Sequence, residues 1–409
     1  MTKESLPSLF DLTPLNEVYR ADPHILLRDL RERCPVHKDD VSGLFVLTRY
    51  ADVREIVSSK TIWRDPRLAE EGATMMKMQT SADETDVPRS EATSILFLDN
   101  PDHARIRLPL TKAFYARIAK FRPALETLID EALDRIDPSK PFDLMSSFCV
   151  PIPIDAIASI LGVDHERLVE FRRWSEGVIQ SLNPYRNEAE TAEMEVCQEA
   201  LNNYFTETII ARRAAPQDDL ISDMTKLQAE GADISDVELR INLGALLVGG
   251  NLTTTDLIGN AVRLLLLNPA ELAKLQTDPA LINSVVEETL RFEPPVDITT
   301  RVASEDMYIG GCPVKPTQGV CMSLRAANRD PAVFDNPDRF EIGNKRSPHV
   351  AFGGGSHICI GAPLARLEAQ VAILKLFERF PNLSLVNPDN PVWRTLPFFR
   401  GLERLDVKA

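Results

Sequence analysis

The spacing of apolar residues predicts helices over much of the chain. Residues 23–34 and 51–58 carry apolar positions at helical spacing. Between them, Val36 and the apolar run 44–47 flank a Ser-Gly turn, which predicts a β-hairpin. Residues 64–94 are polar and irregular, a pattern typical of a lid, a binding loop or a disordered segment.

Most of residues 103–290 also follow a helical pattern. Prolines and turn residues divide this stretch near 138–141, 151–153, 183–184 and 215–216. Residues 296–321 are rich in β-branched and turn residues and predict short strands. After a proline-rich segment at 331–348, a last helix is expected from about Pro363 to Phe380. The pattern predicts a mainly α fold with a smaller β-region formed by separated pieces.

The composition is that of a globular protein, with 44% hydrophobic and 26% charged residues. The chain has no low-complexity linker and no repeat, so we expect a single domain over 1–409 that can enclose a cofactor. The first residues lack the apolar core of a signal peptide. The most apolar stretches, 243–248 and 264–267, are too short to span a bilayer. These features predict a cytoplasmic protein with no membrane partner.

Charge and cysteine usage narrow the functional classes. The formal charge of −15 argues against a nucleic-acid partner, because phosphate binding needs concentrated Lys and Arg. Six scattered cysteines without a Cys-x-x-Cys pair argue against a zinc site or a disulfide framework and suit a reducing compartment.

The strongest chemical signal is the segment from Phe352 to Gly361, which reads Phe-Gly-Gly-Gly-Ser-His-Ile-Cys-Ile-Gly and precedes a helix. A thiolate ligand of haem iron needs a backbone that passes close to the porphyrin, which glycine allows. It also needs N–H groups and a helix N-terminus near the sulfur of Cys359. His357 can reach a haem propionate. The alternative is a buried cysteine in a glycine-rich turn.

This segment resembles the haem-binding signature of the cytochrome P450 family, Phe-Gly-x-Gly-x-His/Arg-x-Cys-x-Gly. The resemblance extends from about Pro23 to the end of the chain. It implies the cytochrome P450 fold around haem b (iron protoporphyrin IX), with Cys359 as the axial metal ligand. Phe352, His357 and Gly361 fall on further cofactor-binding positions.

Other haem contacts follow from the same resemblance. His103 and Arg107 are four residues apart on a helix that begins near Pro101, so they share one face. The family uses such a His-x-x-x-Arg pair for the haem propionates, and Arg301 is similar to its third propionate contact. For His103 alone, a surface histidine is the plain alternative.

A Glu-x-x-Arg pair provides a structural landmark. Glu288 and Arg291 lie three residues apart on one helical face and can form an ion pair. A solvated helix pair is the usual explanation of this spacing. The resemblance instead implies a buried structural network that Arg339 completes.

The segment 246–256 interrupts an apolar helix with glycines and threonines. Glycine is unfavourable inside a helix, and a threonine hydroxyl can bond the carbonyl one turn earlier. A tight helix crossing would explain this composition. The resemblance implies an oxygen-binding groove, in which Gly249 and Gly250 make room for the haem and Thr253 hydrogen-bonds dioxygen and passes protons.

The acid that usually precedes this threonine in the family is replaced by Leu252. Leucine cannot relay a proton. Asp256 lies one helical turn later and is one candidate substitute. The other is an ordered water chain that Asn251, Thr253 and Thr254 would anchor.

These expectations combine into a haem-thiolate monooxygenase that inserts one atom of dioxygen into a small apolar organic substrate. The family positions for substrate contact are Leu246, Gly249, Val296, Ile298 and Phe398. We expect a monomer that receives electrons from a ferredoxin and its reductase. The candidate landing residues are Lys112, Arg117, Lys345 and Arg346. Two alternatives stay open: a peroxide-driven oxygenase and a non-catalytic haem-thiolate protein that binds a ligand.

Overall fold

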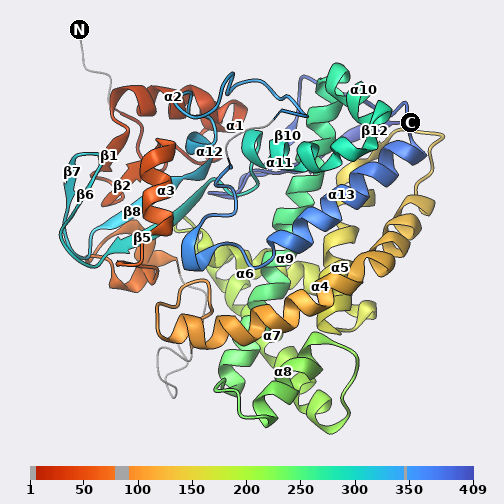
Figure 1. Cartoon of the computed structure of the whole chain (residues 1–409), viewed down its shortest axis with the longest axis horizontal. Coiled ribbons are helices and arrows are strands. Elements are labelled where there is room, and N and C mark those ends of the chain that lie inside the picture. Colours follow the sequence, from red (N-terminus) through yellow and green to blue (C-terminus); the bar gives the residue numbers. More distant parts are fainter. Residues whose placement is uncertain (1–5, 79–91, 345–347) are drawn as a thin grey trace.

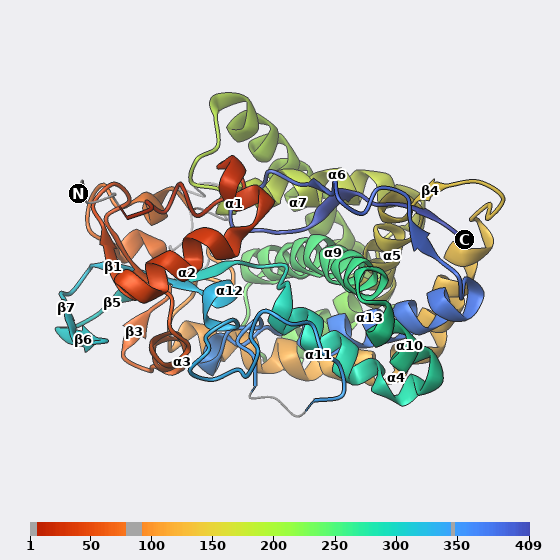
Figure 2. The ribbon, with the colours of Figure 1, turned by 90° about the horizontal axis from the view of Figure 1, so that it is seen from above.

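A long helix, α9 (Asp236–Leu267), runs through the middle of the molecule (Figures 1 and 2). The computed structural model describes residues 6–78, 92–344 and 348–409. Buried residues lie on all sides of α9, as expected for a helix in the centre of a large core. A capping box starts it: Ser235 Oγ accepts from the Glu238 N–H, and the Glu238 carboxylate accepts from the Ser235 N–H.

Five helices pack directly against α9. They are α5 (Pro151–Leu161), α6 (Leu168–Val178), α7 (Glu188–Ala214), α11 (Ile282–Phe292) and α13 (Ala362–Arg379), and α4 (Asp102–Asp134) packs outside them against α5 and α13. The remaining helices are α1 (Glu17–Ala21), α2 (Pro23–Arg33), α3 (Tyr50–Ser58), α8 (Leu220–Ala229), α10 (Pro269–Thr277) and α12 (Leu324–Ala327). Among the described residues, no helix combines the length and apolar character needed to cross a membrane.

The largest sheet has the order β1-β2-β8-β5-β3 and contains β1 (Val36–Asp39), β2 (Leu44–Leu47), β8 (Gly319–Ser323), β5 (Ile298–Ala303) and β3 (Ile62–Trp63). The pair β2–β8 is parallel, and the other neighbours are antiparallel. Three smaller sheets contain β4 (Phe142–Asp143) with β12 (Asp406–Lys408) and β9 (Ser384–Leu385), β6 (Met307–Ile309) with β7 (Cys312–Val314), and β10 (Val392–Trp393) with β11 (Leu402–Arg404). The largest sheet and the β6–β7 pair lie at one side of the helical region, whereas β10 and β12 lie toward the other side, near the C-terminus (Figure 1).

The predicted mainly α fold with a smaller β-region is confirmed. The predicted hairpin is β1–β2, in which Val36 pairs with Leu47. The last helix, predicted to begin near Pro363, begins at Ala362. Proline marks the start of α13, because its fixed φ suits the first turn of a helix.

The capping box of α9 gives a test of how far the core depends on this helix. Ser235→Ala removes the side-chain acceptor for the Glu238 N–H and should lower the free energy of unfolding by about 1 kcal/mol. Urea unfolding followed by circular dichroism measures this change. Ser139→Ala, in an exposed turn, is the control and should stay within about 0.5 kcal/mol of the parent protein. An equal loss in both variants would contradict the role of the cap.

Candidate active site

One cavity of about 340 Å³ brings together most of the residues that the sequence marked for chemistry. It lies between α9, the start of β5 and the loop that precedes α13. Cys359, Thr253 and Arg301 all line it, although they come from three distant parts of the chain. Hydrophobic side chains of α5, α9 and the chain end form much of the remaining wall.

The loop from Phe352 to Gly361 presents the Cys359 side chain to this cavity. The Cys359 N–H donates to the Phe352 carbonyl at 2.9 Å, which closes the loop. Gly355 has φ +63°, and an added Cβ there would lie 2.6 Å from the Val57 carbonyl oxygen. Glycine is therefore required at 355 by both backbone conformation and close packing.

The surroundings of the Cys359 sulfur act on its charge in two directions. Burial raises the pKa of the thiol, whereas hydrogen bonds from the N–H groups of Gly361 and Ala362, together with the Arg107 charge, act to lower it. The sulfur also stands at the N-terminus of α13, where the helix dipole favours negative charge. These groups suit a sulfur that carries its charge while bonded to a metal cation.

Five basic side chains converge at one edge of the cavity: Arg64, His103, Arg107, Arg301 and His357. The rings of His103 and His357 lie 4.0 Å apart. Burial, followed by the charges of Arg107 and Arg301, lowers the pKa of His103 to about 4. Burial and the neighbouring cations also lower the pKa of His357. In the described part of the chain, the buried Nε2 of His103 has no hydrogen-bond partner.

A group with three arginine charges and an unpartnered buried histidine nitrogen is suited to an anionic ligand. The two carboxylates of haem supply that charge, so the residues present fit the cofactor. Arg107, one of the predicted propionate contacts, also donates to the carbonyl of Ile358 and so holds the cysteine loop against α4.

Arg64 is a member of this group that the sequence reasoning missed. Its backbone N–H donates to both carboxylate oxygens of Asp99, at 2.8 and 3.0 Å. Its guanidinium donates to the carbonyl and hydroxyl oxygens of Thr300 and lies over the Phe97 ring. Residue 64 begins the irregular stretch, where no periodicity or motif marks a functional side chain.

The two glycines of α9 have different surroundings. An added Cβ at Gly249 would have no described atom within 4 Å, because this position faces the cavity. At Gly250 the added Cβ would lie 3.2 Å from Ile157 Cγ1, so this glycine also allows α5 to pack closely. Thr253 lies on the cavity wall and its hydroxyl donates to the Gly249 carbonyl at 2.9 Å. Gly249 thus leaves open space at the cavity wall, and Gly250 allows the close crossing of α9 and α5.

The expected position of Asp256 beside the oxygen site is wrong. Asp256 is fully buried and accepts two hydrogen bonds from Arg394 Nη1, each at 2.9 Å, away from the cavity lining. Burial raises the pKa of Asp256 to about 6, although Arg394 acts to lower it.

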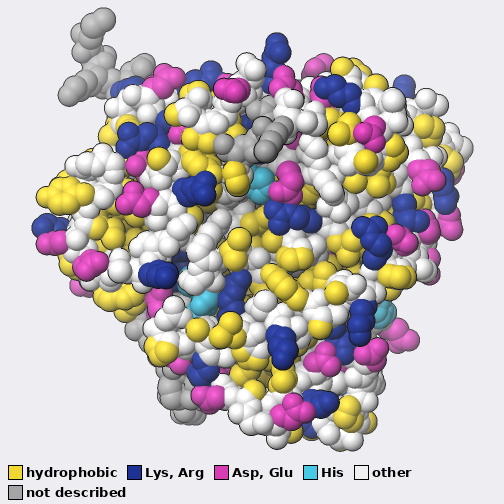
Figure 3. Space-filling model, in the orientation of Figure 1, with side chains coloured by type: hydrophobic (Ala, Val, Ile, Leu, Met, Phe, Trp, Pro, Cys, Tyr) yellow, Lys and Arg dark blue, Asp and Glu magenta, His cyan; other side chains and the backbone are white. Residues whose placement is uncertain are grey.

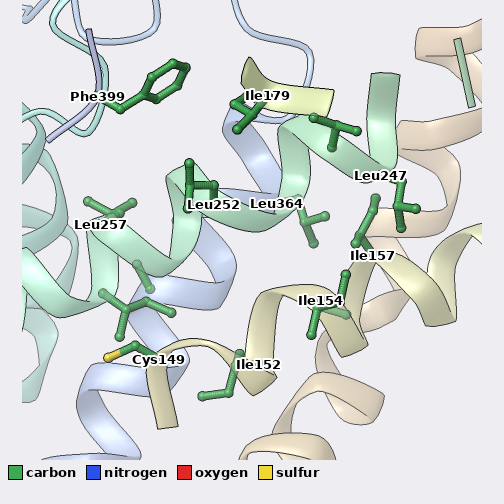
Figure 4. Close-up of a cluster of buried hydrophobic side chains, with 14 of the residues drawn as sticks. Cys149, Ile152, Ile154, Ile157, Ile179, Leu247, Leu252, Leu257, Leu364 and Phe399 are labelled. Carbon is green, nitrogen blue, oxygen red and sulfur yellow. The ribbon is translucent and has the colours of Figure 1, made fainter. Parts of the chain in front are cut away.

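Two neighbouring positions of α9 also lie off the cavity wall. Asn251 is buried and is not among the lining residues. Figure 4 shows Leu252 within a cluster of buried hydrophobic side chains. Of the four residues considered for proton transfer, Thr253 and Thr254 line the cavity.

The Glu288–Arg291 pair forms a buried network behind the cysteine loop. Arg291 donates to both Glu288 carboxylate oxygens at 2.8 Å and to the backbone carbonyls of Asn328, Pro337 and Arg339. The expected role of the Arg339 side chain is wrong, since it is 74% exposed and pairs with Glu341. Arg339 joins the network only through its carbonyl, which a residue of any type could supply.

The predicted substrate-contact residues surround a common space. The cavity is lined by all five: Leu246, Gly249, Val296, Ile298 and Phe398. Among the described lining residues there is no Asp or Glu.

The predicted landing residues divide into three cases. Lys112 is exposed on α4. Arg117 is already paired, with Asp223 at 2.6 Å and Asp218 at 3.1 Å, which argues against it as a free cation for a partner. Lys345 and Arg346 lie outside the described residues.

A helical enclosure around α9, with a cysteine and a group of cations facing one cavity, defines a haem-binding class of protein. Comparison with known proteins agrees. A model of the cytochrome P450 family matches residues 75–393. Cytochrome P450 107B1 of Saccharopolyspora erythraea is 37% identical over 420 residues, covering 100% of this chain and 99% of the relative.

Two further relatives match over nearly their whole length. The 6-deoxyerythronolide B hydroxylase of Saccharopolyspora erythraea is 33% identical, and the match covers 96% of this chain and 97% of the hydroxylase. The crystal structure of P450BioI in complex with hexadec-9Z-enoic acid ligated acyl carrier protein has a TM-score of 0.87 at 32% identity, covering 96% of this chain and 100% of its own. The chain belongs to the cytochrome P450 family, which binds haem, and is a cytochrome P450 monooxygenase.

The Glu288–Arg291 pair yields a stability prediction. Glu288→Gln leaves the Arg291 charge buried without its partner and should lower the free energy of unfolding by about 3–5 kcal/mol. The matched control is Glu126→Gln, which breaks the exposed pair with Arg122 and should cost at most about 1 kcal/mol. Chemical unfolding of both variants measures the difference. Similar losses in the two would show that burial does not strengthen the dependence on this pair.

Proposed function

We propose that this protein inserts one atom of dioxygen into a small, mostly apolar organic substrate, with Cys359 as the thiolate ligand of haem b. One observation carries the proposal: Cys359 and Thr253 line the same cavity, and the group of cations stands at its edge. When bound, thiolate-ligated haem supplies the activation of dioxygen. The protein supplies the position of the cofactor, an apolar space for substrate and a route for protons.

The cofactor would be held at two places. The N–H groups of Gly361 and Ala362 stabilise negative charge on the Cys359 sulfur. Arg64, Arg107 and Arg301 would bind the two propionates through their charges, and His103 would donate a hydrogen bond, because these side chains meet at the cavity edge. His357, whose ring lies against that of His103, is placed in the same group.

Protons are proposed to reach the cavity through threonine hydroxyls. Thr253 and Thr254 bring hydroxyl groups to the wall, whereas Leu252 and Asp256 lie elsewhere on α9. A hydroxyl can accept a proton from water on one side and donate one on the other. The Thr253 Oγ1, already oriented by its bond to the Gly249 carbonyl, is the group to which we assign this role.

The substrate is proposed to have mostly hydrocarbon surface. The contact residues Leu246, Val296, Ile298 and Phe398 offer no charge to it. Two relatives support this class, one a 6-deoxyerythronolide B hydroxylase and the other bound to a carrier-linked hexadec-9Z-enoic acid. A ligand without charged groups would bind here by removing apolar surface from water.

Electrons are proposed to come from a ferredoxin-type protein that docks on the face formed by α4 and the cysteine loop. Leu108 is 71% exposed there, and Ile358 of the loop is 48% exposed. Lys112 is exposed one turn after Leu108. Figure 3 shows this side of the molecule, where apolar side chains lie among charged side chains of both signs. Exposed apolar residues with a lysine beside them suit the docking of an acidic electron carrier.

A peroxide-driven oxygenase is the second candidate. The observation that favours it is the cavity lining, which in the described residues contains no carboxylate. Hydrogen peroxide brings both of its protons with it, so a chain without a carboxylate beside the oxygen site could use it directly. Product formed with peroxide alone, at a rate above that with NADH, ferredoxin and ferredoxin reductase, would establish this function.

Replacing the proposed ligand tests the haem assignment. Cys359→Ser should abolish the thiolate-type absorption spectrum of the carbon monoxide complex, because serine gives iron no thiolate sulfur. Cys312→Ser, at a half-buried position outside the cavity lining, should keep that spectrum. A thiolate spectrum that survives in the Cys359→Ser protein would contradict the assignment.

The role of Thr253 is tested by the coupling of electron use to product. Thr253→Ala should raise the share of electrons released as hydrogen peroxide at least about threefold, since proton delivery by a positioned group contributes a factor of about 100 or more to a reaction step. Thr277→Ala is the matched control, because its hydroxyl makes the same bond to the carbonyl four residues earlier, at 2.8 Å, on an exposed helix. Peroxide and product are measured against NADH consumed. Unchanged coupling in the Thr253 variant would exclude the proposed role.

A further inference from the structure

Two segments far apart in the sequence form one wall of the cavity. Residues 295–298 precede and enter β5, and residues 398–399 lie near the chain end; both segments line the cavity. They are joined directly, because the Asp297 N–H donates to the Phe398 carbonyl at 2.9 Å and the Arg400 N–H donates to the Pro295 carbonyl at 2.9 Å. Val296 and Phe399 form an isolated antiparallel bridge. We call these two segments the paired wall.

A buried set of charges lies behind the paired wall. Asp297 and Arg325 are both completely buried, and Arg325 Nε donates to Asp297 Oδ1 at 2.5 Å. Arg325 also pairs with Glu293, to which Arg400 Nε donates at 3.0 Å. Two acids and two bases therefore balance. Charges buried in this way are held in one arrangement, since removing any partner leaves another uncompensated.

This charge network is tied to the first helix of the chain. The hydroxyl of Tyr19, which is 1% exposed, donates to Asp297 Oδ2 at 2.9 Å. Arg400 Nη1 donates to the Arg20 carbonyl at 2.8 Å. Helix α1 thus contacts both halves of the paired wall through their charged residues, 297 and 400. Tyr19 itself is not among the described residues that line the cavity.

One residue of the paired wall has an unfavourable backbone conformation that the surrounding hydrogen bonds maintain. Phe398 has φ +67°, in the left-handed region that a bulky residue rarely adopts. Such a conformation persists only where surrounding contacts determine it. Here the Phe398 carbonyl accepts from Asp297, and the N–H groups of Phe399 and Arg400 donate to Leu396 and Pro295. The conformation places the Phe398 ring against the substrate space.

We propose that Tyr19 is a positioning residue that sets the shape of the substrate space, by holding Asp297 and through it the paired wall. The selectivity of the enzyme for bulky ligands then depends on a residue of α1 that never touches them. This inference rests on the proposed function, since it requires a haem-bound cavity. Without the Tyr19 hydroxyl, Asp297 Oδ2 loses a donor in a buried place, and the segment that carries Val296 and Ile298 relaxes.

Two iron-binding probes of different size separate this role from general stability. Imidazole is small enough to bind haem iron without reaching the paired wall, whereas econazole is bulky and must contact the walls of the cavity. We would measure the Kd of each probe with the purified holoenzyme from the shift of its haem absorption. The ratio of the two Kd values reports the shape of the cavity and cancels changes at the iron.

Tyr19→Phe should change the ratio of econazole to imidazole Kd at least about threefold, because a lost hydrogen bond to a buried charged group is more than enough for such a change. Imidazole Kd alone should change less than about twofold. The matched control is Tyr204→Phe. Tyr204 is also buried, with 6% of its surface exposed, and its hydroxyl accepts from the Asp164 N–H, outside the network. That variant should keep the parent ratio.

Each outcome has a single meaning. A ratio unchanged in Tyr19→Phe, or changed equally in Tyr204→Phe, overturns the positioning role. If the parent protein binds neither probe at a haem iron, the proposed function fails instead. If Tyr19→Phe does not accumulate as holoenzyme, Arg400→Lys tests the network from its other end and should change the ratio in the same way. Loss of holoenzyme in both variants would show a purely structural network and overturn the proposal.

Discussion

The structure depends on holding a charged sulfur at the edge of an apolar cavity. A thiolate removed from water is costly unless dipoles or cations stabilise it. Cys359 receives the N–H groups of Gly361 and Ala362, the N-terminus of α13 and the charge of Arg107. These groups meet at one point because α13, α4 and the glycine-rich loop pack together. The other side of the loop packs against α3, where an added Cβ at Gly355 would collide with the backbone of residue 57.

Buried charge has two opposite uses in this protein. Glu288 with Arg291, and Asp297 and Glu293 with Arg325 and Arg400, are balanced pairs that join distant segments. The group at the cavity edge is unbalanced, and burial together with the neighbouring positive charges lowers the pKa values of His103 and His357. Buried ion pairs with equal positive and negative charge favour a fixed architecture, whereas the excess of positive charge at the cavity edge favours the binding of an anionic cofactor.

Helix α9 connects the core to the chemistry. One side presents Gly249, Thr253 and Thr254 to the cavity, and the other packs Leu252 and Asp256 into the protein. The same helix therefore provides open space, hydroxyl groups and a packing surface at adjacent positions. Because Asp256 is engaged by Arg394, this protein differs from the expectation of an acid beside the threonine, and the two hydroxyls are the polar groups that α9 offers to the cavity.

The sequence by itself determined the features that depend on local spacing. Hydrophobic periodicity and proline positions predicted the β1–β2 hairpin and the helix that begins at Ala362, because both signals act over a few residues. The cysteine motif identified the family and, with it, several residues of the cavity.

Tertiary structure decided the features that depend on partners distant in the chain. Asp256 could be placed on a helix face, but Arg394, 138 residues away, determines what that face contacts. Arg64 and Tyr19 carry no sequence signal, since each acquires its role from residues more than 200 positions later, namely Thr300 and Asp297. At Arg339 the backbone carbonyl, and not the side chain, binds Arg291. A pattern of side chains in the sequence cannot reveal a contact made by the backbone.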